Sequence, residues 1–67
     1  MYYDVKYWST EERRNMGESD IWHTVEDFEQ AIETARMLVR KGIAVCAEVV
    51  TDDDEVVIFG CDNKREW

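Results

Sequence analysis

The chain begins with a stretch in which apolar and polar side chains alternate. Within residues 2–8, Tyr3, Val5 and Tyr7 fall on one side of an extended backbone, and charged residues lie between them. A period of two is typical of a strand that buries one face. The pattern therefore predicts a first strand over residues 2–8.

The next segments carry weaker patterns. Residues 9–19 are polar, contain Gly17 and show no apolar period, which predicts a loop. Residues 20–23 include Ile21 and Trp22, two residue types that favour strands. We expect a short second strand here that returns beside the first.

The clearest pattern is helical and predicts a helix over residues 25–41. Thr24 is the expected N-cap, with Asp27 at the spacing of a capping box, and Gly42 is the expected left-handed residue after the helix. The apolar positions recur at helical spacing and form a stripe. The stripe consists of Val25, Phe28, Ile32, Ala35 and Val39, with Ala31 and Leu38 at its edge.

Two further runs, residues 43–50 and 56–61, are rich in β-branched side chains and predict a hairpin. A three-residue loop at residues 52–54 pairs Val49 with Val57 and separates apolar from polar side chains. It also pairs Ala47 with Phe59 and Val45 with Cys61. A two-residue loop mixes the two kinds of side chain, so we prefer the first register. That register places Cys46 and Cys61 on opposite faces, which excludes a disulfide between them.

These elements predict one α+β domain over residues 1–67, in the order β–β–α–β–β. One helix packs on one face of a four-stranded, mainly antiparallel sheet. The other face is more apolar than a fully solvated face should be, and such a patch suggests a partner or a self-contact. We expect it to carry Asp4, Lys6, Trp8, Ala44, Cys46, Glu48, Val50, Val56 and Ile58.

The net charge restricts the possible partners more than the length of the chain does. Sixteen acidic residues face eight basic ones, so the formal net charge of the 67-residue chain is −8. This charge opposes direct binding to nucleic acid and to anionic membranes, and it favours basic partners. The chain shows no secretory signal, and no apolar run approaches the roughly 20 residues of a membrane span. We therefore expect a cytoplasmic protein.

Candidate chemistry is sparse. The four carboxylates of residues 52–55 lack the spacing of a calcium-binding loop, and one His with two separated Cys does not match a zinc site. A nucleophile drawn from Cys46 or Cys61, with His23 as base, lacks a predicted cleft. No Gly-rich phosphate loop is present in the sequence. We expect neither a cofactor nor a metal, and no enzymatic activity.

The acidic side chains are the remaining candidates for function. They gather on the outer face of the predicted helix, near its start, and in the hairpin loop. Either they are only solvated, or they resemble an array of phosphates and occupy the basic groove of a partner. The candidate partner-binding residues are Asp20, Glu26, Glu29, Glu33, Asp52, Asp53, Asp54 and Glu55.

In size and charge the chain resembles the small acidic inhibitors encoded by phages and mobile elements, a class that includes anti-CRISPR proteins and other DNA mimics. Glu26, Glu29, Glu33 and residues 52–55 carry this resemblance. It implies stoichiometric blocking of a nucleic-acid-binding complex in the host cytoplasm, without catalysis. The alternative is a small scaffold or assembly module that binds through the uncovered sheet face, as a homodimer.

Overall fold

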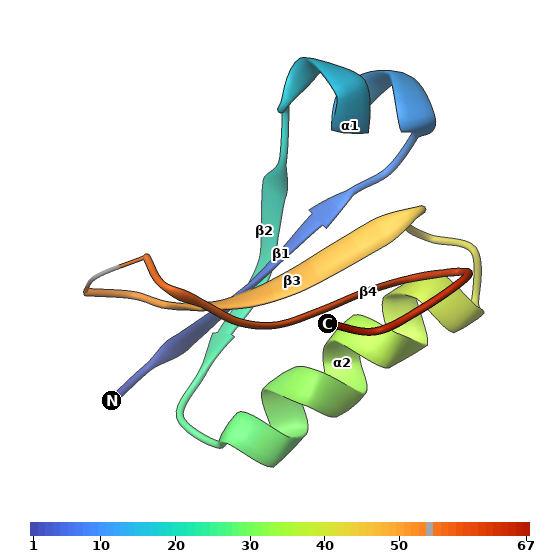
Figure 1. Ribbon diagram of the computed structural model, residues 1–67. Helices are drawn as coiled ribbons and strands as arrows, with labels where there is room; N and C mark the ends of the chain where they lie inside the picture. The colour runs from blue at the N-terminus through green and yellow to red at the C-terminus, as the bar shows by residue number, and fades with distance from the viewer. Residues whose placement is uncertain (54) are drawn as a thin grey trace.

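The computed structural model describes residues 1–53 and 55–67, and it confirms the α+β class. Four strands form one antiparallel sheet in the order β2-β1-β3-β4, and α2 packs on one of its faces (Figure 1). A second, shorter helix lies between β1 and β2. The elements are β1 (Tyr3–Trp8), α1 (Glu11–Met16), β2 (Asp20–Val25), α2 (Phe28–Arg40), β3 (Cys46–Thr51) and β4 (Val57–Asp62).

The core lies between α2 and the sheet. Leu38, Val5 and Val49 are its largest fully buried side chains. Val5 sits in the middle of β1, and Tyr3 and Tyr7 pack against the same core. The alternation at the start of the chain therefore predicted the buried face of β1 correctly.

The expectation of a loop over residues 9–19 was wrong, because this segment contains α1. The helix begins after Thr10, whose hydroxyl accepts a hydrogen bond from the backbone N–H of Arg13 at 3.1 Å. It ends at Gly17, which has a φ of 72°, the left-handed conformation that glycine adopts without strain. None of its six residues is buried. An apolar period could not reveal α1, because the helix has no buried face.

The long helix begins three residues later than expected. Val25 belongs to β2, where it pairs with Tyr3, and α2 starts at Phe28. Asp27, rather than Thr24, is the N-cap, and its carboxylate accepts a hydrogen bond from the backbone N–H of Glu29 at 2.9 Å. The prediction failed because Val25 satisfies the helical period and the strand period equally well. At the other end, Gly42 has a φ of 76°, as expected.

The buried face of α2 is also turned relative to the expected stripe. Ala31, Ala35 and Leu38 are its buried residues, whereas Phe28 keeps 38% of its surface exposed. Two alanines against the sheet let the helix backbone approach closely. Leu38 completes this contact, and Phe28, Ile32 and Val39 flank it instead of forming its centre.

The register of the β3–β4 hairpin differs from the prediction by two residues. Val49 pairs with Phe59 rather than with Val57, and an irregularity follows at the next pair. A shift of two residues leaves Ala47, Val49, Phe59 and Cys61 on the core side, as predicted. The expected core positions of Val57 and Ile43 were wrong, because the irregularity pairs Val57 with Val50 and the side chains of Val57 and Ile43 are exposed. The observed pairs are Cys46 with Asp62, Ala47 with Cys61, Glu48 with Gly60, Val49 with Phe59 and Val50 with Val57.

The sheet face opposite α2 is less open than expected. Ala44 precedes β3 and belongs to the core cluster on the α2 side, so its expected place on this face was wrong. Cys46 and Val50 are each only 3% exposed. Cys46 and Cys61 are free thiols, and the register places them on opposite faces.

Candidate functional site

One row of paired residues defines an end of the sheet. Tyr3 pairs with Val25 on one side and with Thr51 on the other. The segments that follow Val25 and Thr51 therefore leave the sheet at the same end, beside the N-terminus (Figure 1, left). We call this region the acidic end. Its described acidic residues are Glu26, Asp27, Glu29, Asp52, Asp53 and Glu55.

Packing and capping fix the helical part of the acidic end. The ring of Phe28 lies 5.6 Å from the ring of Tyr3, which holds the first turn of α2 against β1. The carboxylate of Asp27 accepts hydrogen bonds from the backbone N–H groups of Glu29 and Gln30. Asp27 is thus used for capping, whereas the side chains of Glu26 and Glu29 face solvent.

Backbone hydrogen bonds fix the β3–β4 turn against the same end. The N–H of Asp52 donates to the carbonyl of Tyr2 at 3.2 Å, and the N–H of Glu55 donates to the carbonyl of Thr51 at 3.0 Å. Glu55 has a φ of 53°, in the left-handed region. Asp54, a fourth candidate in this turn, lies outside the described residues.

The structure separates two of the predicted site residues from the others. Asp20 pairs with Tyr7, toward the opposite end of β1, and its carboxylate lies 3.1 Å from the guanidinium of Arg13. Glu33 lies 3.3 Å from the guanidinium of Arg36 on the next turn of α2. Arg13 compensates Asp20, whereas Arg36 is shared between Glu33 and Glu66. The prediction grouped Asp20 with the acidic end because its spacing does not show that it meets Arg13, and it overlooked the i,i+3 spacing of Glu33 and Arg36.

Positive side chains are absent from the segments that form the acidic end. Residues 24–35 and 42–63 contain neither Lys nor Arg. Among the described residues, Glu26, Glu29, Asp52 and Glu55 form no ion pair with a side chain. The result is a concentrated negative surface.

The opposite end of the sheet carries most of the basic residues. It is defined by the row in which Cys46 pairs with Trp8 and with Asp62. The helix α1, the end of α2 and the turn after β4 all lie there. The basic residues in these segments are Arg13, Arg14, Arg40, Lys41, Lys64 and Arg65. Acidic residues lie at this end as well, so the two kinds of charge balance here, whereas the acidic end has carboxylates without Lys or Arg.

Exposed apolar side chains accompany the carboxylates of the acidic end. Val56 is 52% exposed and Phe28 is 38% exposed, and Met1, Tyr2 and Val57 are exposed as well. Large apolar groups that face water beside charged ones are typical of protein-binding surfaces. The sequence does not reveal this feature, because these residues come from three separate segments.

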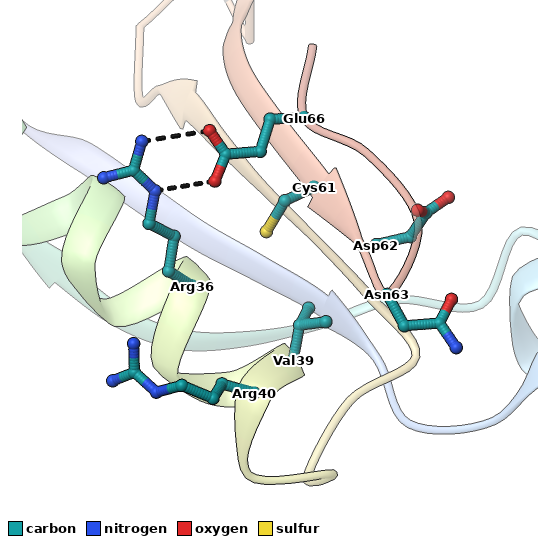
Figure 2. Close-up of a pocket in the computed structure, with 7 residues that line it drawn as sticks. All are labelled: Arg36, Val39, Arg40, Cys61, Asp62, Asn63 and Glu66. Carbon is teal, nitrogen blue, oxygen red and sulfur yellow. Dashed lines mark hydrogen bonds and ion pairs between the residues drawn. The ribbon is translucent and has the colours of Figure 1, made fainter.

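A shallow groove of about 410 Å³ lies between α2 and the end of the chain (Figure 2). Burial raises the pKa of the Cys61 thiol in it to about 11, so this thiol is protonated at neutral pH. The groove is lined by Arg36, Val39, Arg40, Cys61, Asp62, Asn63 and Glu66. Its two acids are already paired, Asp62 with Arg14 outside the groove and Glu66 with Arg36 within it.

The residues considered for catalysis do not meet. His23 lies on β2 and stacks on Trp22 with ring centres 5.9 Å apart, whereas Cys46 lies on β3, with β1 between the two strands. Within residues 1–53 and 55–67, no group of three or more His, Cys, Asp or Glu side chains is placed to hold a metal ion. In the same part of the chain, no helix has the length and apolar character to cross a membrane.

Comparison with protein-family models, with curated proteins and with solved structures finds no match to this chain.

Proposed function

We propose that the protein is a non-enzymatic inhibitor that binds a basic, nucleic-acid-binding protein through its acidic end and acts as a DNA mimic. One observation carries the proposal: two separate segments, after Val25 and after Thr51, bring uncompensated carboxylates to the same end of the sheet. Glu26, Glu29, Asp52 and Glu55 supply the charge. The resemblance to small acidic anti-CRISPR and DNA-mimic proteins agrees with it.

The lack of Lys and Arg in the segments of the acidic end, residues 24–35 and 42–63, favours this proposal over a purely solubilising role. Carboxylates spread evenly over a surface give solubility, but a field concentrated at one end also orients the molecule as it approaches a basic groove. The exposed rings and valines among the carboxylates would then make the short-range contacts. Such a complex weakens as salt screens the charges.

The alternative, a scaffold that binds through the sheet face opposite α2, has less support. Cys46 and Val50, two of the apolar residues expected on that face, are buried within the chain itself. A homodimer formed through this face would be insensitive to salt, which separates it from the leading proposal.

The proposal is tested by two charge-reversed variants with equal net charge. E26K/D52K changes the acidic end, whereas E12K/E18K changes exposed residues in and just after α1, near the other end. Each reversal changes the charge by two, so both variants move from −8 to −4. Each immobilised protein is exposed to a nuclease-treated bacterial lysate at low and at high salt. We expect E12K/E18K to retain the wild-type partner at low salt and E26K/D52K to lose it; equal retention by both would contradict the proposal.

A further inference from the structure

The last residues of the chain form a strand-like segment along the outer edge of β4. Gly60 and Trp67 exchange two backbone hydrogen bonds, of 2.7 and 2.8 Å, and Cys61 pairs with Glu66. The N–H of Asp62 donates to the carbonyl of Arg65 at 2.9 Å and closes the turn between the two segments. Part of the edge of the sheet is thus covered by the chain itself.

Two side chains of this segment fit specific positions on the body of the protein. The Glu66 carboxylate accepts hydrogen bonds from the Arg36 guanidinium at 2.8 and 3.0 Å, a two-point contact visible in Figure 2. The Trp67 ring covers Gly60 so closely that a Cβ on Gly60 would overlap atoms of the ring. The edge therefore accepts an extended segment with an acidic residue followed by an aromatic one.

Only exposed contacts hold residues 63–67 against the rest of the protein. All five residues from 63 to 67 are exposed, and Trp67, the largest of them, keeps 41% of its surface in water. The Arg36–Glu66 pair is also about half exposed, and exposed ion pairs stabilise little and are screened by salt. Segments held only by exposed contacts of this kind open readily. Opening leaves the edge of β4 unpaired, and an unpaired edge is a template for another strand.

We propose that the outer edge of β4 is a strand-docking site, filled by residues 65–67 of the same chain in the closed monomer and by residues 65–67 of a second copy in an exchanged dimer. The second copy is the occupant because its segment is the ligand whose fit the structure displays. Both forms make the same contacts, so protein concentration and the stability of the turn decide between them. This site is separate from the acidic end.

Two complementary variants test the exchange directly. R36E sets two carboxylates against each other at this contact, and E66R sets two guanidinium groups against each other, so each chain repels its own segment. A mixed dimer restores an opposite-charge pair at both sites. By light scattering, we expect each variant alone to have the monomer mass of about 8.0 kDa and the equimolar mixture to reach twice that mass. The double variant R36E/E66R restores the pair within one chain and is expected to stay monomeric.

Two variants that change side-chain size, G60A and W67A, repeat the test without changing any charge. G60A cannot accept Trp67, whereas W67A leaves its own Gly60 uncovered. In an exchanged dimer the Trp67 of the first variant covers Gly60 of the second, and the two alanines meet at the other site. Amide spectra of every variant confirm folding before mixing. If both mixtures stay monomeric at millimolar concentration while all variants are folded, the exchange proposal is overturned.

Discussion

The guanidinium of Arg14 lies 3.3 Å from the carboxylate of Asp62, which follows it by 48 residues in the chain. This contact joins α1 to β4 on the face opposite α2. Asp62 pairs directly with Cys46 in the sheet, so the ion pair lies beside that thiol and helps to shield it. The short helix therefore shields the sheet around Cys46 and Asp62. The polar character of residues 9–19 did not suggest this role.

Removing Arg14 should expose Cys46. Burial raises the pKa of the Cys46 thiol, so in the wild-type protein we expect slow alkylation by iodoacetamide at pH 8. In R14A we expect the rate at Cys46 to rise severalfold, with no change at Cys61, which lies on the other face. Peptide mass spectrometry measures both rates. The Arg14 guanidinium lowers the pKa of this thiol, so its loss alone would slow the reaction, and a faster rate reports exposure. R14K is the control that keeps a cation, and a rate in R14A that does not rise would contradict shielding by this contact.

Asp62 should make stability depend on acid pH. The backbone N–H of Lys64 contributes most to lowering the pKa of Asp62, and the N–H of Arg65 and the guanidinium of Arg14 lower it further, against the effect of burial. A carboxyl group whose pKa falls on folding stabilises the fold above its ordinary value, here 3.8, and this contribution disappears as the pH falls through the lower folded value. Thermal melts from pH 2 to 6 should show a smaller acid slope in D62N than in the wild type. Equal slopes would contradict this role.

Gly60 should tolerate a side chain only when Trp67 is removed. Adding a methyl group at Gly60 places it in the Trp67 ring, and we expect G60A to lose about 1–3 kcal/mol of unfolding free energy, the usual cost of overpacking. In a W67A background the same substitution should be nearly neutral. Chemical denaturation of the four proteins in this cycle measures the coupling. Equal losses in both backgrounds would mean that Gly60 is needed for another reason.

Leu38 should be the most costly single truncation in α2. It is fully buried between the helix and the sheet, and L38A should destabilise the protein by about 2–5 kcal/mol. For a domain of this size, each kcal/mol lowers the melting temperature by about 4–8 °C. I43A, at a position 39% exposed, is the matched control and should change stability by less than about 0.5 kcal/mol. A small loss in L38A would place the centre of the core elsewhere.

Patterns that report burial predicted the structure well. The period of two in β1 and the apolar composition of β3 and β4 placed Val5, Val49 and Cys61 on the core side. The register error of two residues did no harm to this assignment, because side chains alternate with the same period. The predicted start of the long helix was wrong, because Val25 fits both the helical period and the strand period. Its pairing with Tyr3 assigns it to β2.

Features that depend on distant partners could not be predicted. Asp20 looked like a member of an acidic surface, but Arg13 lies beside it in space. The pairing of Glu33 with Arg36, at i,i+3 on α2, was by contrast visible in the sequence and was missed. The segment after β4 has no apolar period, and its place on the sheet follows from the absent side chain of Gly60. Glu26 and Asp52 meet at one end because the strands that precede them, β2 and β3, both pair with β1. The order of elements along the chain does not determine this pairing.

The central claim is that the acidic end competes with nucleic acid for a basic protein. The most direct measurement is the displacement of labelled DNA from the protein captured in the lysate experiment, titrated with wild type, E26K/D52K and E12K/E18K at physiological salt. We predict that wild type and E12K/E18K displace the DNA and that E26K/D52K does not. Displacement by E26K/D52K at the same concentration as by E12K/E18K would contradict the claim.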